Sequence, residues 1–348
     1  MGGLPEECRV FIKFVVRIMV EHLAIIGLGS IGRRHLRVAR ELRPELKITI
    51  VRSGRGESSE EEKLADNIFY SLEKAVDAGI QAAVISTPAV CHLEQVKVLM
   101  QAGINILVEK PLSHTTDHVH DIIKVQKNLN LVCLVGYCLR HDPCAVRFNE
   151  NLISKIKSGE ILHASVDCGS YLPNWRPGQN YRQSVSANKD LGGGVLLELS
   201  HELDYIRWFF GGMESVYANI SSSETLEVDA EDSAEMIFVT SRGFPIFVHL
   251  DFNSRSSRRT CSVRSTNGDL IWDAIRREVS WQPADGSKKI KSYDYDQDEI
   301  YRKQMHHFFE CIEDGQSPAV SLAEGAAVLR MIEAARKSNA IGKKIAIA

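Results

Sequence analysis

Three glycines with the spacing Gly27-x-Gly29-x-x-Gly32 have the pattern that holds the phosphates of a dinucleotide. They follow the apolar run Leu23–Ile26, which is typical of a buried strand, and precede a stretch that is typical of a helix. In this pattern the first glycine permits a tight turn, the second lets backbone approach a pyrophosphate, and the third lets helix and strand pack closely. The N–H groups at the start of that helix would also attract the phosphates. The alternative is a tight turn that binds nothing.

Basic residues follow the second predicted strand, Lys47–Val51. Arg52 stands about 20 residues after the last of these glycines, where an acid would hold the ribose 2′-hydroxyl of NAD and an arginine suits the 2′-phosphate of NADP. Arg52, Ser53 and Arg55 would together grip such a phosphate through charge-assisted hydrogen bonds of ~1.5–3 kcal/mol each, enough for at least tenfold discrimination. We therefore expect NADP(H) to be favoured over NAD(H). A solvated turn is the alternative interpretation.

Further cofactor contacts are expected at the carboxyl ends of the other strands, because ligands of parallel sheets bind there. A strand over 82–86 ends at Thr87-Pro88, and a strand over 104–108 ends at Glu109-Lys110-Pro111. A lysine at this edge should lie near the nicotinamide. The predicted cofactor-binding residues are Gly27, Gly29, Ser30, Ile31, Gly32, Arg52, Ser53, Arg55, Thr87, Pro88, His92, Glu109 and Lys110.

These residues require a scaffold of alternating strands and helices, and residues 20–140 have that pattern. It predicts a Rossmann domain, an α/β fold with a doubly wound parallel sheet. Residues 1–19 form an extension before it. Because a nucleotide-binding strand usually starts close to the beginning of a chain, we expect Met19 to be the biological start. Alternatively, the extension adds a strand or an arm.

The second half, residues 141–348, has a different character. Six strand patterns between 215 and 282 and two closing helices predict an α+β domain with a large, mostly antiparallel open sheet. An irregular segment over 171–182 is rich in aromatic and cationic residues, which is typical of a functional loop. We predict substrate contacts from four of them, Tyr171, Trp175, Arg176 and Arg182. An arm that packs on a neighbouring subunit is the alternative.

Composition narrows the classes of function. The chain has 348 residues, and its net charge of −3 lacks the basic excess of a nucleic-acid-binding surface. Eight scattered cysteines without a Cys-x-x-Cys pair suit reduced thiols in a cytoplasm. No apolar run approaches the ~20 residues that span a bilayer, and no histidine cluster has a matching metal-ligand set. We therefore expect a cytoplasmic protein with no metal site, no nucleic-acid partner and no membrane partner.

Three features occur together along this chain. They are Gly27-x-Gly29-x-x-Gly32-x-x-His35, the tripeptide Glu109-Lys110-Pro111, and the stretch 192–204 with the sequence GGGVLLELSHELD. In this order and spacing the chain resembles the Gfo/Idh/MocA oxidoreductase family from residue 20 onward. The resemblance implies a Rossmann domain followed by an α/β domain whose open sheet often forms oligomer interfaces. It also implies oxidation or reduction of a carbinol on a sugar, cyclitol or sugar nucleotide, and a homo-oligomer, either a dimer or a tetramer.

The resemblance also implies roles for single residues. The family lysine that orients the reacting hydroxyl falls on Lys110, and the family acid–base histidine falls on His201. Histidine titrates near neutral pH, and a lysine stabilises a developing alkoxide. The family acid usually stands four residues before the histidine, whereas Glu198 stands three before it. Either Glu198 takes that place, or the acid is lost and Asp204 supports His201. All three would share one face of a helix over 195–210.

One more departure concerns the end of the last strand of the first half. The family often has Asn after the aromatic residue that falls on Tyr137, whereas this chain has Cys138 and then Arg140. We therefore add Arg140 to the expected substrate contacts. The predicted function is an NAD(P)-dependent oxidoreductase of a sugar, sugar acid, cyclitol or sugar nucleotide. The alternatives are a tightly bound cofactor used for transient oxidation in glycosidic cleavage or epimerisation, and a non-enzymatic ligand sensor on the same fold.

Overall fold

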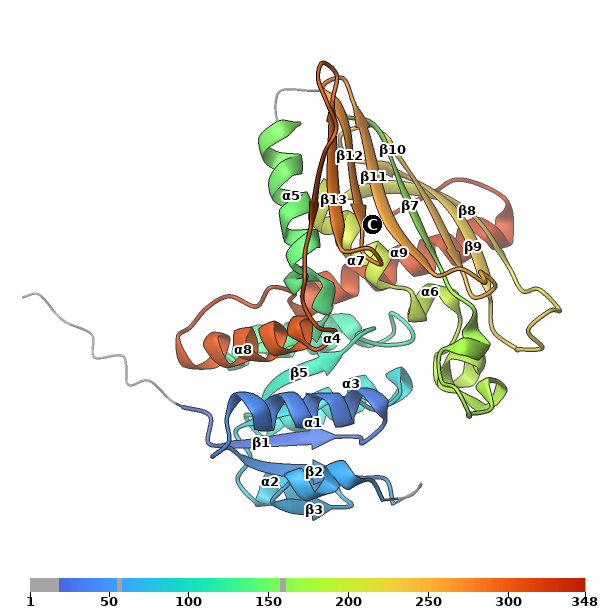
Figure 1. The fold of residues 1–348 in the computed structure, drawn as a ribbon. Helices are drawn as coiled ribbons and strands as arrows, with labels where there is room; N and C mark the ends of the chain where they lie inside the picture. Colours follow the sequence, from blue (N-terminus) through green and yellow to red (C-terminus); the bar gives the residue numbers. More distant parts are fainter. Residues whose placement is uncertain (1–18, 55–57, 157–160, 348) are drawn as a thin grey trace, which may run out of the picture.

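The computed structural model describes residues 19–54, 58–156 and 161–347, and its first half forms a six-stranded sheet (Figure 1). The strand order is β3-β2-β1-β4-β5-β6, and every neighbouring pair is parallel. These apolar strands suit a sheet that is covered on both faces. The strands are β1 (His22–Ile26), β2 (Lys47–Val51), β3 (Asn67–Phe69), β4 (Ala82–Ile85), β5 (Asn105–Glu109) and β6 (Cys133–Gly136).

Helices connect these strands, as the prediction of a doubly wound sheet requires, and that prediction is confirmed. Three single turns of 3-10 helix lie at the strand ends: η1 (Glu60–Leu64), η2 (Ala89–Cys91) and η3 (Cys138–His141). The α-helices are α1 (Ser30–Leu42), α2 (Leu72–Asp77), α3 (His92–Gln101) and α4 (Val119–Leu129).

The second half contains a nine-stranded sheet in the order β14-β13-β12-β11-β7-β10-β9-β8-β15. Only β7 and β10 pair in parallel, so the prediction of a mostly antiparallel sheet is confirmed. The two short edge strands, β14 and β15, were not predicted. The strands are β7 (Ile161–Gly169), β8 (Met213–Ser221), β9 (Ser233–Thr240), β10 (Pro245–Asp251), β11 (Arg258–Ser265), β12 (Gly268–Asp273), β13 (Glu278–Pro283), β14 (Lys289–Ser292) and β15 (Ile345–Ala346).

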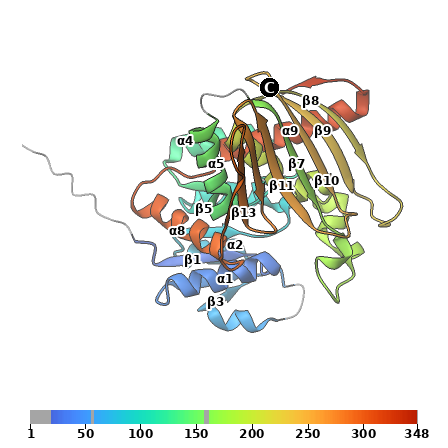
Figure 2. The same cartoon turned by 45° about the horizontal axis from the view of Figure 1, so that its top comes forward.

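Helices cover one face of this sheet, and the other face is open (Figures 1 and 2). They include α5 (Pro143–Lys155), α6 (Val195–Glu198), α7 (His201–Phe210) and α9 (Leu322–Ile341). The helix predicted over 195–210 is interrupted at Leu199 and Ser200, so the prediction of one continuous helix is wrong. Glu198 therefore ends one helix and His201 begins the next, so the two residues do not share the i, i+3 positions of a single helix.

Helix α8 (Glu299–Glu313) returns to the first domain and packs on α1. Its side chains Met305, Phe308 and Phe309 join the buried core around β1. An ion pair of 2.9 Å between Arg34 and Asp298 ties α1 to the segment that precedes α8. The division of the chain near residues 140 and 141 stays a prediction, and the expectations for the extension over 1–18 lie outside the described residues.

Candidate active site

The glycine turn between β1 and α1 has the shape that a dinucleotide requires. Gly27 has φ +88°, and a Cβ at Gly32 would overlap the carbonyl oxygen of Gly27. A Cβ at Gly29 would meet no atom within 4 Å, so this backbone faces open space. The first turn of α1 carries no acidic residue, which keeps its N-terminus attractive to an anion. These residues therefore fit the pyrophosphate of a nicotinamide dinucleotide.

The end of β2 places the predicted phosphate-binding arginine against an acid. Arg52 Nη1 donates to Glu62 Oε1 of η1 at 2.6 Å, and the two side chains are 10% and 13% exposed. Glu62 also accepts from the backbone N–H of Ser59, which fixes its carboxylate. The negative charge of Glu62, which is paired with Arg52, would therefore repel a 2′-phosphate at this position. Ser53 lies at the same strand end, while the predicted contact Arg55 falls outside the described residues.

His92 joins two of the loops that were predicted to contact the cofactor. Its Nε2 lies 2.8 Å from the carbonyl oxygen of Thr87, and its Nδ1 lies 2.9 Å from that of Pro111. Burial lowers the pKa of this imidazole. Thr87 also donates to Gln95 at 2.7 Å, and its methyl group lies beside Gly27. His92 therefore supports the cofactor side of the site through Thr87 and Pro111, next to Pro88.

Glu109 likewise serves the architecture of the site. Its Oε1 lies 2.7 Å from Nε2 of His35 on α1, and both residues are buried. Its Oε2 accepts from the backbone N–H of Lys110 at 3.2 Å. The carboxylate thus ties the glycine-turn helix to the Lys110 turn, which continues into a cis peptide bond before Pro111.

Lys110 reaches the second domain through Glu198. Its Nζ donates to the carbonyl oxygen of Glu198 at 2.7 Å and lies 3.7 Å from the Glu198 carboxylate. The two side chains are 18% and 21% exposed, so a substrate can still contact them. In one of the two alternatives left open by the sequence, Glu198 takes the place of the acid that supports His201. In the structure the Glu198 carboxylate lies near Lys110, on the far side of the helix break from His201 in sequence.

His201 begins α7 and lies against Tyr137 at the end of β6, with the ring centroids 5.5 Å apart and the planes at 81°. Its Nδ1 is enclosed and has no hydrogen-bond partner among the described residues. Burial, then the charges of Lys110 and Arg259, hold the pKa of His201 well below its usual value. The imidazole is therefore neutral at physiological pH, which suits a group that accepts a proton.

Arg140 and Asp204 form an ion pair with each other. Arg140 donates from Nε and Nη2 to the two carboxylate oxygens of Asp204, each at 2.9 Å, and it also contacts Glu324 at 3.2 Å. Both side chains are buried. Asp204, which in the other alternative supports His201, pairs with Arg140 in the structure, and its role toward His201 stays a prediction. Arg140 ties η3 to α7 and α9 through these contacts, and its contact with substrate stays a prediction.

The four other predicted substrate residues lie in the irregular segment after β7. The guanidinium of Arg255 covers the ring of Tyr171 at 3.6 Å. Trp175 donates to Ser170 at 2.8 Å and packs edge-on against a buried phenylalanine. Arg182 pairs with Glu227 at 2.8 Å, and Arg176 is exposed. These contacts hold the segment to its own domain, and substrate binding by these residues stays a prediction.

A cation in the surroundings of His201 was not among the predicted site residues. Arg259 of β11 donates from Nε to Glu202 Oε1 at 2.8 Å, and Glu202 directly follows His201. The signal was present in the alternation of β11, because Arg259 shares its face with Cys261 and Val263, which are both fully buried. A charged residue on the inward face of a strand calls for a partner or a function.

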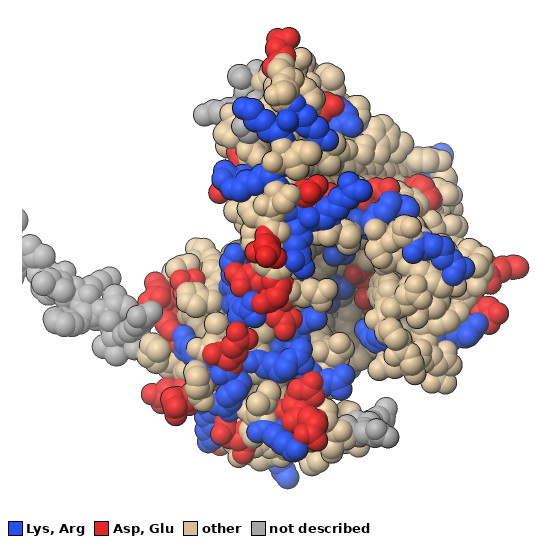
Figure 3. All heavy atoms as spheres, in the orientation of Figure 1, with Lys and Arg blue, Asp and Glu red and all other residues tan. Residues whose placement is uncertain are grey.

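A hollow separates the first domain from the lobe that carries the irregular segment over 171–191, and lysine and arginine side chains gather along it (Figure 3).

No group of three or more His, Cys, Asp or Glu among the described residues is placed to hold a metal ion. None of the described helices has both the length and the apolar character needed to cross a membrane.

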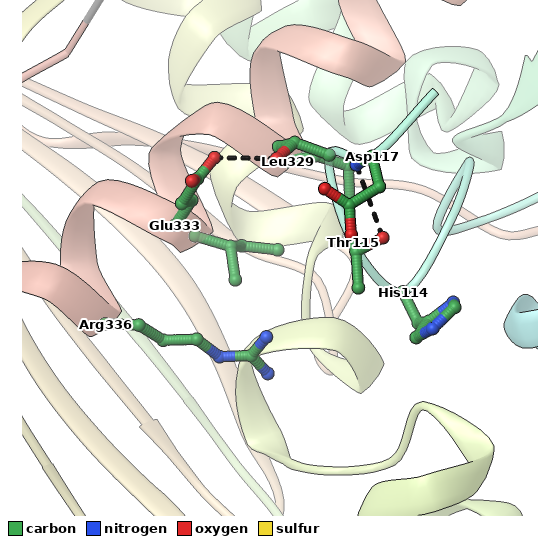
Figure 4. Close-up of a pocket in the computed structure, with 8 residues that line it drawn as sticks. His114, Thr115, Asp117, Leu329, Glu333 and Arg336 are labelled. Atoms are coloured by element: carbon green, nitrogen blue, oxygen red, sulfur yellow. Dashed lines mark hydrogen bonds between the residues drawn. The ribbon is translucent and has the colours of Figure 1, made fainter. Parts of the chain in front are cut away.

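A separate cavity of about 220 Å³ lies between the loop after Pro111 and α9 (Figure 4). Thr116 donates to Glu333 across it at 2.8 Å. Arg336 pairs with Glu231 at 2.9 Å, and the Glu231 carboxylate fills the position where a Cβ on Gly194 would stand. The cavity is thus linked, through Arg336 and Glu231, to Gly194, the residue that precedes α6.

Comparisons with known proteins agree with this geometry. The model of an oxidoreductase family with an NAD-binding Rossmann fold matches residues 22–137, and the model of an oxidoreductase-family C-terminal alpha/beta domain matches 152–347. D-xylose 1-dehydrogenase (NADP(+)) 2 of Haloferax volcanii is 21% identical over 277 residues, or 77% of this chain and 81% of that protein. The scyllo-inositol 2-dehydrogenase (NAD(+)) of Bacillus subtilis is 24% identical over 317 residues, or 86% and 88%. A solved structure of levoglucosan dehydrogenase with NADH is 22% identical and superposes with a TM-score of 0.83, covering 94% of this chain and 99% of that one.

Proposed function

This chain belongs to the Gfo/Idh/MocA oxidoreductase family and is an NAD(P)-dependent oxidoreductase, and from that premise we propose that it moves a hydride between a nicotinamide and a carbinol of a sugar, sugar acid, cyclitol or sugar nucleotide. The observation that carries the proposal is the contact of Lys110 Nζ with Glu198, three residues before His201. This contact joins Lys110, at the end of β5, to the segment of the second domain in which α7 begins.

The surroundings of Lys110 and His201 support a separate chemical role for each residue. The nicotinamide, when bound, supplies or accepts the hydride. Lys110 donates a hydrogen bond to the reacting hydroxyl and stabilises negative charge on its oxygen as the proton leaves. His201, neutral because of its lowered pKa, accepts that proton at Nε2, since its Nδ1 is enclosed. Glu198 holds Lys110 in place through its carbonyl oxygen.

Turnover of the two single variants tests this assignment. Absorbance of reduced nicotinamide would be followed with NAD(+) or NADP(+) and a panel of sugars, sugar acids, inositols and nucleotide sugars. Lys110→Ala and His201→Ala should each lower kcat by ~10²-fold or more, as is typical of acid–base groups, while cofactor affinity stays within about threefold. Lys124→Ala, on the first domain but distant in sequence from the strand end, is the control. Unchanged turnover in either variant would refute its role.

For the cofactor, we propose that Arg52 and Glu62 together set the choice between NAD(H) and NADP(H). The predicted preference for NADP(H) requires Arg52 to exchange Glu62 for the 2′-phosphate. With Glu62 in place, the carboxylate instead suits NAD(H), whose ribose 2′-hydroxyl would donate a hydrogen bond to it. The relatives named above include one NADP(+) enzyme and one NAD(+) enzyme.

We also propose that the chain forms a homo-oligomer through the open face of its large sheet. Tyr217, Ile237 and Phe247 stand opposite one another on three adjacent strands. Their exposed fractions are 47%, 40% and 44%, so they form an apolar row on the surface. A contiguous exposed apolar surface of this kind is typical of a protein interface.

A further inference from the structure

The inward-facing arginine of β11 is held in an asymmetric ion pair. Glu202 is fully buried, whereas a quarter of the Arg259 side chain is exposed. The hydrogen bond to Glu202 uses Nε of the guanidinium. The Arg259 side chain also makes a hydrogen bond with Cys168 of β7. Because Nε is the atom bonded to Glu202, donors of the guanidinium remain beyond this ion pair, in a side chain that is partly accessible. Such a planar group binds carboxylate or phosphate through paired hydrogen bonds.

The position of Arg259 in the sheet places that exposed part near the reacting groups. Arg259 stands opposite Cys168, one residue before β7 ends at Gly169, and the irregular segment of the hollow follows. Its partner Glu202 lies in the first turn of α7, next to His201. The charge of Arg259 also reaches the imidazole, since it helps to lower the pKa of His201. Two cations, Lys110 and Arg259, therefore contact residues close in sequence to the proposed proton acceptor, Glu198 and Glu202.

The neighbouring Arg258 shows that only the inward face of β11 pairs an arginine with a fully buried carboxylate. Arg258 points to the opposite face of β11, where it pairs with Asp167 at 3.1 Å and lies 3.6 Å from Asp251. Its side chain is solvent-exposed, as expected of an ordinary surface ion pair. Arg259 instead pairs with the buried carboxylate of Glu202, the residue that directly follows His201. The two neighbours thus form a natural pair of test and control positions.

We propose that Arg259 binds an anionic group of the substrate, a carboxylate or a phosphate, while Lys110 and His201 act on a carbinol of the same molecule. This inference rests on the function proposed above and narrows it to acidic or phosphorylated carbohydrates. Glu202 holds the guanidinium in position from below. Neutral sugars lack the group that Arg259 contacts and bind more weakly.

Binding to the complex with NADH tests the inference without turnover. Calorimetric titrations would compare D-glucose, D-glucuronate and D-glucose 6-phosphate, which differ at one carbon and separate the carboxylate from the phosphate. We expect at least one of the two anions to bind at least tenfold more tightly than D-glucose. Arg259→Gln should remove that preference, and Arg258→Gln should leave it unchanged.

Glu202→Gln distinguishes anion binding from mere support of α7. If Arg259 acts only as a partner of Glu202, both variants should weaken all three ligands equally; if it binds the anion, Glu202→Gln should keep an anion preference that Arg259→Gln loses. Should Arg259→Gln fail to fold, Arg259→Lys keeps a charge beside Glu202 without the paired donors, and should reduce the preference. Equal affinity for the three ligands, no binding of either anion, or a preference that survives in Arg259→Gln would overturn the inference. The proposed function would stand in that case if turnover of neutral sugars still required Lys110 and His201.

Discussion

Glu62→Gln should shift the cofactor preference of this chain toward NADPH. The wild-type carboxylate lies 2.6 Å from Arg52, and both side chains are mostly buried, so it neutralises the guanidinium at the end of β2. The neutral amide keeps the shape of the side chain and removes the negative charge. A 2′-phosphate would then meet Arg52 without displacing a carboxylate, whereas the ribose 2′-hydroxyl of NADH would exchange a charged carboxylate acceptor for a weaker, neutral amide oxygen.

The size of the shift follows from the bonds exchanged. A hydrogen bond to a charged group contributes ~1.5–3 kcal/mol, and each 1.4 kcal/mol corresponds to about tenfold in affinity. One Arg52–phosphate bond gained should therefore change the ratio of NADH and NADPH dissociation constants by ~10-fold or more. Since the change is a ratio within one protein, a general loss of stability cancels from it.

Fluorescence titration with NADH and NADPH measures both constants, and two controls locate the effect. Glu61→Gln changes the adjacent residue of η1, which contacts Arg37 at 3.1 Å, and should leave the ratio as in the wild type. Arg52→Gln combined with Glu62→Gln should abolish the gain for NADPH. The reasoning is refuted if Glu62→Gln leaves the ratio within about twofold, or if the double variant retains the full shift.

Three other predictions concern protonation and assembly. The pKa of His201 lies well below 6.5, so protonation of this histidine should cause no loss of kcat/KM for carbinol oxidation as the pH falls from 8 to 6.5. A loss with a midpoint near 6.5 that is absent in His201→Gln would show that the pKa of His201 is not lowered. Burial lowers the pKa of His141 to about 4, so the unfolded chain binds more protons between that value and 6.5 and stability falls with pH in this window. Between pH 7 and 5 this histidine should cost up to about 2 kcal/mol, and denaturant unfolding of His141→Gln should show a shallower loss. Phe247→Glu should convert the oligomer to monomers in light scattering after size exclusion, and an unchanged mass would exclude this face as the interface.

The fold and the glycine turn were predictable because they depend on local pattern. Alternating apolar strands and helices specify a parallel sheet whatever the details of the side chains. The requirement at Gly32 is equally local, since any Cβ there meets the Gly27 backbone. The meeting of Lys110 with the region of His201 was implied by the resemblance to the family, and the contact that joins the two domains goes through the Glu198 carbonyl oxygen.

Pairings between charged side chains could not be predicted in the same way. The sequence suggested Arg52 for a phosphate, Arg140 for substrate and Asp204 for His201. Each of these side chains found a partner distant in the sequence or outside the motif considered, such as Glu62 for Arg52 and Arg140 for Asp204. Such pairs depend on rotamers and on the exact path of loops, as at the break between α6 and α7. Alternation along β11 was the local signal for Arg259.

The return of α8 to the first domain has a consequence for synthesis on the ribosome. Phe308 and Phe309 complete the core around β1, and Glu313 accepts hydrogen bonds from Arg43 and from the backbone N–H of Val20. The cofactor-binding half therefore lacks part of its interior until the chain has emerged as far as Glu313, about nine-tenths of its length. Although that half is translated first, its folding must wait for, or be revised by, a segment made near the end. A fragment that stops near residue 140 would expose the apolar surface that α8 covers and should aggregate.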